Sequence, residues 1–148
     1  MPPIVLLLSG PNLGLLGERQ PEIYGTATLA DHVARATATA TALGLELEHL
    51  QSDAQVDLVT AVHGARGRVA AIIVNAGAVT HYGWSLHDAI ASFEGPVVEL
   101  HLSNPDAREP FRHTSVLSPV VSGAIVGFGA LGYELAVKAV ASMLQVAA

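Results

Sequence analysis

The chain of 148 residues contains no cysteine, and its seven Lys and Arg are outnumbered by thirteen Asp and Glu. Without cysteine there is no disulfide and no thiolate metal site, which fits a reducing compartment. A net charge of −6 without a basic run argues against nucleic acid or a membrane surface as a partner. No apolar stretch reaches the roughly 18 residues of a membrane span. We therefore expect a soluble cytoplasmic protein with no nucleic-acid or membrane partner.

Charged residues of both signs are scarce. They make up only 14% of the chain, whereas 51% of the residues are hydrophobic. This composition excludes a disordered protein, and the length predicts one domain over residues 1–148. A monomer of this size would leave much apolar surface in water, so we expect a homo-oligomer.

Short apolar runs alternate along the chain with longer periodic segments. This order is typical of an α/β fold, a parallel sheet with helices on both faces. We expect five strands, at residues 4–9, 45–51, 69–75, 97–102 and 120–126. We expect helices from a cap at Thr28 to about 43, from a cap at Ser52 or Asp53 to about 66, and over 85–93 and 131–144. The segments 9–25 and 103–118 are read as irregular loops, the first rich in Gly and Pro and typical of a lid.

Several familiar motifs fail on their spacing. Residues 127–132 match G-x-G-x-x-G, but only 16 residues follow, too few for a dinucleotide-binding unit, so tight packing of strand against helix is the better reading. The glycine-rich loop after the first strand lacks the Gly-Lys-Ser/Thr ending of a phosphate loop. The histidines have no spacing of a compact metal site, and no G-x-S-x-G elbow of a serine hydrolase is present. We therefore expect no metal.

Ligands of such sheets bind beyond the carboxyl ends of the strands, where one charged pair stands out. Glu99, His101 and Ser103 alternate along the fourth strand and therefore share one face. A carboxylate paired with His101 would fix its tautomer and keep it protonated as a general acid. The alternative is a strand end at which both side chains face water.

Arginines gather close to this pair in the sequence. Arg108 and Arg112 are four residues apart just after His101, and Arg19 lies in the loop that ends at Tyr24. This cluster in an acidic protein indicates a small anionic ligand, although surface ion pairs with acidic neighbours are an alternative. Arginines beside the Tyr24 hydroxyl would stabilise a phenolate; without them Tyr24 would only anchor the loop.

At this point the sequence resembles the type II 3-dehydroquinate dehydratase family over nearly its whole length. The shared motifs are G-P-N-L-G at 10–14, Gly17, Arg19, Tyr24, Gly25, Gln51, Ser52, N-A-G at 75–77, Thr80, His81, Leu86, Asp88, Ala89, E-L-H-L-S-N at 99–104, A-R-E at 107–109, F-R-H at 111–113, Ser118, Pro119 and G-F-G-A-L-G-Y at 127–133. Many motifs in one order make the resemblance specific. It implies a flavodoxin-like three-layer sandwich, dehydration of 3-dehydroquinate to 3-dehydroshikimate without a cofactor, and a cytoplasmic dodecamer built of trimers.

The resemblance also implies a role for each site residue. The expected catalytic residues are Tyr24 as base, Arg19 and Arg108 beside it, Asn12 holding a water against the enolate, and His101 as acid oriented by Glu99. The expected substrate-binding residues are Asn75, Gly77, His81, Leu102, Ser103 and Arg112, with Asp88 reaching in from a neighbouring subunit. Residues from about 16 to 24 would close as a lid. The single lysine, Lys138, lies in the last helix, so the imine route of type I enzymes is not expected.

The chain departs from the family pattern before and within the third helical segment, at 85–93. Tyr82, Gly83 and Trp84 replace the usual Thr-Ser-Val, and His87 stands where Arg is usual. Pro105, Asp106 and Pro110 are further departures. Two other functions stay open. A flavodoxin-like electron carrier would need a Ser/Thr-rich phosphate loop after the first strand, where this chain is apolar and glycine-rich. A catalytically inactive relative could bind the same ligand.

Overall fold

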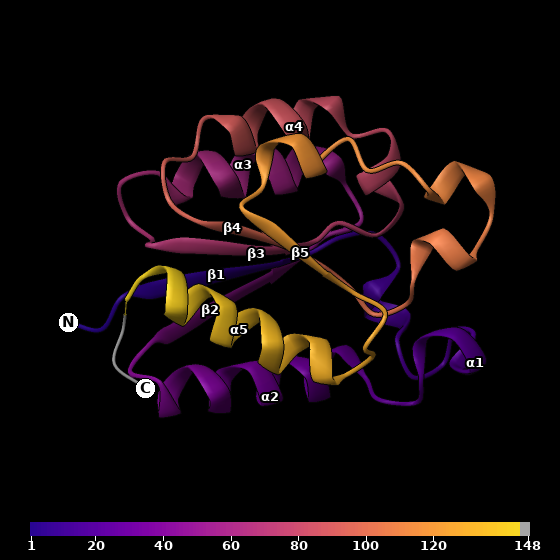
Figure 1. Cartoon of the computed structure of the whole chain (residues 1–148), viewed down its shortest axis with the longest axis horizontal. Helices are drawn as coiled ribbons and strands as arrows, with labels where there is room; N and C mark the ends of the chain where they lie inside the picture. Colours follow the sequence, from indigo (N-terminus) through magenta and orange to yellow (C-terminus); the bar gives the residue numbers. More distant parts are fainter. Residues whose placement is uncertain (146–148) are drawn as a thin grey trace.

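Five parallel strands form one sheet in the order β2-β1-β3-β4-β5 (Figure 1). The computed structural model describes residues 1–145. The strands are β1 Ile4–Ser9, β2 Glu46–Gln51, β3 Ala71–Asn75, β4 Val97–His101 and β5 Gly123–Val126. The predicted flavodoxin-like α/β sandwich with a five-stranded parallel sheet is confirmed.

The three central strands are buried along almost their whole length. Every residue of β3 and β4 is buried, and so is every residue of β1 after Ile4. Because helices cover both faces of a central parallel strand, neither face of such a strand meets solvent, which explains the apolar runs in the sequence. The edge strands β2 and β5 are more exposed.

Two helices cover each face of the sheet, as Figure 1 shows. Helices α2 (Leu29–Ala42) and α5 (Leu131–Met143) lie together on one face, and α3 (Gln55–Ala65) and α4 (Trp84–Ala91) lie on the other. Side chains of alternating strand positions divide between two cores. Leu7 and Ile73 pack towards Val137 of α5, whereas Leu8 packs towards Leu86 of α4.

The predicted cap of α2 is confirmed, and that of α3 is wrong. The Thr28 hydroxyl accepts from the Asp31 N–H at 3.1 Å, and the Asp31 carboxylate accepts from the Thr28 N–H at 2.9 Å. Helix α3 begins only at Gln55, and no side chain caps it. The Ser52 hydroxyl instead accepts from the Ala54 N–H and donates to Asp57.

The remaining differences between the predicted and the observed elements concern their bounds and several short helices. The predicted fifth strand begins at Gly123 rather than 120, since Ser118–Val120 forms the 3-10 helix η5, and α4 spans 84–91 rather than 85–93. The two segments read as loops contain η1 Leu13–Leu15, α1 Pro21–Tyr24, η3 Pro105–Ala107 and η4 Pro110–Arg112, and η2 Gly77–His81 follows β3. Helices of three to five residues are too short to carry a helical periodicity that a sequence could reveal.

The glycines at 127–132 pack a strand against a helix, as predicted. A Cβ on Gly132 would lie 2.9 Å from Leu100 Cδ1, so a larger residue at this position would require the Leu100 side chain to move. Among residues 1–145, none of the helices has the length and apolar character needed to span a membrane.

Candidate active site

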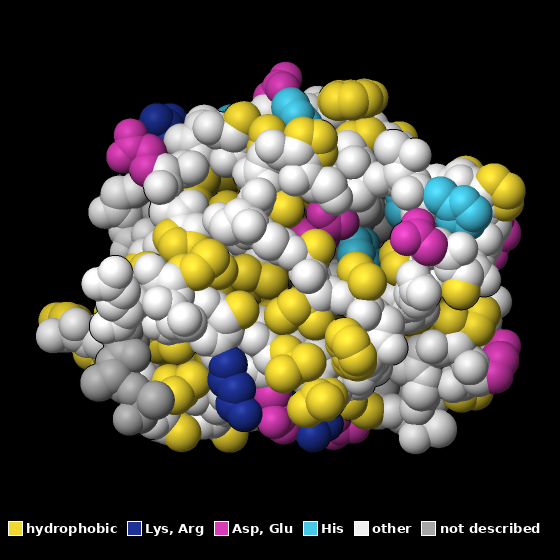
Figure 2. Space-filling model, in the orientation of Figure 1, with side chains coloured by type: hydrophobic (Ala, Val, Ile, Leu, Met, Phe, Trp, Pro, Cys, Tyr) yellow, Lys and Arg dark blue, Asp and Glu magenta, His cyan; other side chains and the backbone are white. Residues whose placement is uncertain are grey.

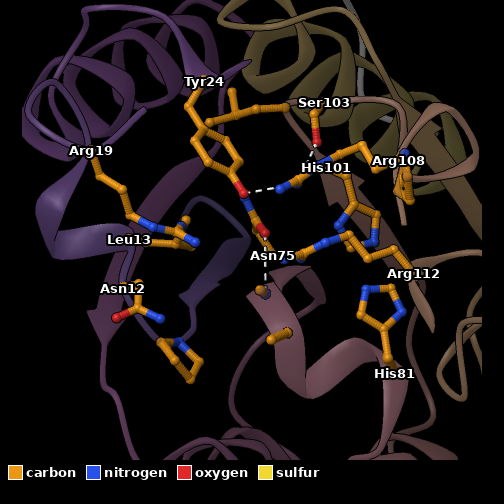
Figure 3. A pocket seen from close by; sticks show the side chains of 15 residues that line it. Asn12, Leu13, Arg19, Tyr24, Asn75, His81, His101, Ser103, Arg108 and Arg112 are labelled. Atoms are coloured by element: carbon orange, nitrogen blue, oxygen red, sulfur yellow. Dashed lines mark hydrogen bonds between the residues drawn. The ribbon is translucent and has the colours of Figure 1, made fainter. Parts of the chain in front are cut away.

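A pocket opens at the carboxyl edge of the sheet, beyond β1, β3 and β4. It holds about 570 Å³ of empty space, part of it open to solvent. The strand order reverses direction at β1 and β3, and crevices at such points bind ligands in open α/β sheets. Figure 3 shows side chains from the 9–25 segment on one side and from β4 and the following loop on the other. The lining residues are Pro11, Asn12, Leu13, Arg19, Tyr24, Asn75, Gly77, Ala78, His81, His101, Leu102, Ser103, Pro105, Arg108 and Arg112.

Tyr24 meets two arginines in this pocket. It is the last residue of α1, and its hydroxyl oxygen accepts a 2.8 Å hydrogen bond from Arg108 Nη1 (Figure 3). The guanidinium carbons of Arg19 and Arg108 lie 5.0 and 5.1 Å from the centroid of the Tyr24 ring. The Tyr24 side chain therefore has two guanidinium groups beside its ring, and one of them donates to its oxygen. The structure thus brings together the tyrosine and arginines that the sequence could only suggest.

Glu99 and His101 form a buried pair on β4. His101 Nε2 lies 2.6 Å from Glu99 Oε2, and the two residues are 9% and 2% exposed. Burial by itself raises the pKa of Glu99, but the hydrogen bond and charge of His101, with hydrogen bonds from Ser115 and Ser118, lower that pKa below its usual range. An ionised Glu99 therefore holds the imidazole by Nε2 while His101 lines the pocket. The pairing favours the predicted dyad over the solvated strand end.

Asn75 lies at the end of β3 and borders the pocket floor. It is 3% exposed, and its side-chain oxygen accepts from the Gly77 N–H at 3.4 Å. Gly77 has φ 58°, and a Cβ there would lie 2.9 Å from the Pro11 carbonyl oxygen, so the turn requires glycine. On the opposite wall, Leu102 and Ser103 follow β4, and the Ser103 hydroxyl accepts from Arg108 at 3.2 Å.

His81 and Arg112 line the pocket on the side of η2 and η4. His81 Nδ1 lies 2.8 Å from the Thr114 carbonyl oxygen, so Nδ1 carries a proton. The neutral ring can therefore accept a hydrogen bond only at Nε2. Arg112 donates from Nε to Glu109 at 2.7 Å and still lines the pocket. The predicted ion pair of Arg112 is thus present, and its side chain also borders the pocket.

Asn12 stands in an unusual conformation at the mouth of the pocket. Its φ of 68° lies in the left-handed region, which asparagine tolerates better than most residues. The Asp53 carboxylate accepts from the Asn12 N–H at 3.0 Å and from Gln51 Nε2 at 3.1 Å. The loop before it is fixed by contact with the turn after β3, since a Cβ on Gly10 would lie only 2.4 Å from the Ala76 carbonyl oxygen. Sequence reasoning missed the role of Asp53, because nothing local indicates that it crosses to the first loop.

Two of the predicted site residues, Glu99 and Asp88, do not line the pocket. Glu99 is connected to it through its hydrogen bond with His101. Asp88 has no such connection. It stands on α4 with its side chain 84% exposed, bonded to the neighbouring His87 at 3.0 Å. The replaced residues nearby are exposed too, Tyr82 at 57% and Trp84 at 62%. Within one chain, Asp88 does not reach the ligand space. Among residues 1–145, no three His, Asp or Glu side chains gather as a metal-ligand group.

Comparisons with known proteins agree on one family. The family described as "Dehydroquinase class II" matches residues 3–141. A protein named 3-dehydroquinate dehydratase from Halalkalibacterium halodurans is 49% identical over 135 residues, 91% of this chain and 93% of its own. One of the same name from Aeromonas hydrophila is 50% identical over 97% of this chain and 96% of its own. The crystal structure of type II dehydroquinase from Propionibacterium acnes superimposes with a TM-score of 0.91 at 42% identity, covering 96% of this chain and 98% of that one.

Proposed function

Because the chain belongs to the class II dehydroquinase family, whose members are hydro-lyases, we propose that it converts 3-dehydroquinate to 3-dehydroshikimate. This elimination of water serves the shikimate pathway or the breakdown of quinate. Residues 1–148 act as one cytoplasmic catalytic domain, and the chemistry needs neither a metal nor an organic cofactor. The observation that carries the proposal is a tyrosine flanked by two arginines in the same pocket as His101, whose ring is held by the buried Glu99.

Tyr24 is the base that removes a proton from C2, beside the ketone of the substrate. The chain has two other tyrosines for comparison. Burial raises the pKa of Tyr133 to about 12, which keeps that residue neutral, and Tyr82 is exposed outside the pocket. Only Tyr24 lines the pocket and contacts Arg19 and Arg108. The two guanidinium groups place positive charge beside the residue that takes the proton.

His101 is the acid that protonates the departing C1 hydroxyl, so that it leaves as water. Glu99 holds its Nε2, which leaves Nδ1 as the ring atom that can transfer the proton. Between these steps the enolate oxygen is stabilised through a water held by Asn12, since charge that develops in the transition state is best met by donors already in place. The segment from about 16 to 24 closes over the substrate and excludes solvent.

The remaining lining residues bind the substrate. Asn75, Gly77, Leu102 and Ser103 form a polar cradle at the strand ends, which suits a carboxylate. His81 and Arg112 on the neighbouring wall suit ring hydroxyls. This division follows the chemistry of the groups, since backbone and amide donors bind an anion whereas His81 Nε2 accepts from a hydroxyl.

Asp88 completes the pocket from a neighbouring copy in a homo-oligomer, a dodecamer built of trimers. Its exposure supports this role, because the side chain is free to enter another subunit. Figure 2 shows hydrophobic side chains gathered over β5 and α5, where Val126, Phe128 and Leu131 are 37%, 62% and 44% exposed. Such surface is more than a monomer usually leaves in water. Light scattering should find a large assembly, and a monomer with full activity would contradict the role of Asp88.

One assay tests the proposal directly. When 3-dehydroquinate is added, the conjugated enone carboxylate of the product should appear as a rise in near-ultraviolet absorbance. The rise should persist after treatment with a chelator, and borohydride in the presence of substrate should leave the protein active. Loss of activity with the chelator would contradict the cofactor-free chemistry. A folded protein that binds the substrate without any rise would be an inactive relative.

A further inference from the structure

Two serines outside the pocket lining bind the carboxylate of Glu99. The hydroxyls of Ser115 and Ser118 each donate to Glu99 Oε1 at 3.1 Å, while Glu99 Oε2 faces His101 at 2.6 Å. Both serines come from the segment that leads into β5, whereas Glu99 and His101 belong to β4. Each carboxylate oxygen therefore has its own donors, and those donors come from two different parts of the chain.

The hydrogen bonds around Ser115 determine where its single proton points. Its Oγ accepts from the N–H groups of Leu117 and Ser118, both at 3.1 Å. A serine oxygen has two lone pairs and one proton, so these two bonds leave only the proton for Glu99. Ser115 is thus fixed as a donor. A donor of this kind stabilises a carboxylate and opposes its protonation at Oε1.

We propose that Ser115 and Ser118 are positioning residues of the dehydration, holding Glu99 ionised and oriented so that it keeps the imidazolium of His101 directed at the leaving hydroxyl. The inference rests on the proposed role of His101 as the acid. Neither serine touches the substrate. Their effect passes through the carboxylate, which lies 2% exposed and could not stay charged there without donors.

Other charged and titratable groups face the same side of Glu99. A second cavity bounded by Glu99, Ser115 and Ser118 is also lined by His81, His101, Asp106, Arg112 and His113. Among the described residues, only His101 and the two serines make hydrogen bonds to the Glu99 carboxylate. The ionisation of Glu99 therefore depends directly on these three donors, and the other groups act on it through space.

The test removes one donor and follows the protonation of Glu99 in the resting protein. Infrared spectroscopy across a pH titration detects the carbonyl band of a protonated carboxyl, and Glu99→Gln identifies which band belongs to Glu99. In Ser118→Ala the midpoint of that band should move to higher pH by about one unit, the size expected for losing one hydrogen bond to a charged group. Ser118→Thr keeps a hydroxyl and should restore the midpoint.

Ser122→Ala is the matched control. Its hydroxyl accepts from the Val97 N–H at 3.0 Å at the start of the same strand, so its loss disturbs β4 without touching Glu99. With substrate, Ser118→Ala should lower kcat about tenfold on the acid limb of the pH profile and much less at high pH, with KM unchanged. Ser122→Ala should keep the wild-type profile.

Two results would overturn the inference. One is a Glu99 band that titrates in Ser118→Ala as it does in the wild type. The other is a kcat that falls by the same factor at every pH, which indicates a structural role only. Should Ser118→Ala fail to fold, Ser115→Ala removes the other hydroxyl donor to Glu99, together with the acceptor of the Leu117 and Ser118 N–H groups. Because the infrared titration needs no turnover, its outcome stands even if the protein does not dehydrate 3-dehydroquinate.

Discussion

The two walls of the pocket are held in contrasting ways. On the β4 wall, Glu99 and His101 belong to a fully buried strand with hydrogen bonds on both sides. On the other wall, Tyr24 ends a four-residue helix with no buried residue, and its segment contains two left-handed residues, Asn12 and Gln20. Segments with few buried contacts are the least stable parts of a fold. The proposed acid, His101, is thus positioned by the sheet, whereas the proposed base, Tyr24, depends on a surface segment and on its contact with Arg108.

Removing the base should have the largest effect. Tyr24→Phe deletes the oxygen that Arg108 contacts and keeps the ring, so we expect kcat to fall about a thousandfold, within the range for loss of a general base. Circular dichroism and the melting temperature should match the wild type, because α1 adds little to the core. Near-normal turnover in this variant would mean that another group removes the proton.

Removing one of the two cations should have a smaller effect. Arg19→Ala leaves Arg108 in hydrogen-bond contact with Tyr24, so we expect kcat to fall about a hundredfold. Steady-state kinetics with 3-dehydroquinate measure the loss, and circular dichroism should show an unchanged fold. Turnover equal to that of the wild type would show that Arg19 does not assist Tyr24.

The contact between the loops after β1 and β3 can be tested by adding one methyl group. A Cβ at residue 10 would meet the backbone of Ala76, so Gly10→Ala should lower the free energy of unfolding by about 2 kcal/mol. Gly64→Ala in α3 meets no atom within 4 Å and should raise it by about 0.5 to 1 kcal/mol. Chemical denaturation measures both. Equal free energies of unfolding for the two variants would show that the loops after β1 and β3 can move apart to admit the methyl group at little cost.

Removing the charge of Glu99 from the β4 wall should lower the free energy of unfolding by an amount that depends on pH. Because the pKa of Glu99 is lowered in the fold, its charge stabilises the native state above the usual carboxyl range, and this contribution disappears as pH falls through the folded value. Glu99→Gln should therefore cost about 1.5 kcal/mol at neutral pH, with the gap to the wild type closing below about pH 4. Urea titrations at several pH values test this. A gap that stays constant would mean that packing, not charge, is responsible.

The sequence predicted those features that repeat at a regular interval. Alternation placed Glu99 and His101 on one face, and apolar runs identified all five strands. The Thr28 cap was visible because its partner stands three residues away. Contacts between distant segments were not visible in this way. Tyr24 and Arg108 are 84 positions apart, and no periodicity reports that they touch.

Contacts between distant segments also explain why the predicted cap of α3 is wrong. Ser52 and Asp53 have the residue types of a helix cap, yet their side chains have other partners. The Ser52 hydroxyl donates to the Asp57 carboxylate, and the Asp53 carboxylate accepts from the Asn12 N–H. The role of Asp88 in a neighbouring subunit stays a prediction, since the side chain is exposed on α4 and a single chain does not test it. Composition and pattern thus predict the scaffold, whereas the partners of polar side chains depend on the three-dimensional path of the chain.

The loops after β1 and β3 leave no space between them. The Gly10 N–H donates to the Asn75 carbonyl at 2.8 Å, and Gly77 lies against Pro11. Neither loop can gain a side chain or an inserted residue at these points without moving the other. The positions of Asn12 and Asn75 therefore depend on each other, and a chimaera that exchanges only one of the two turns should misplace the amide that it did not replace.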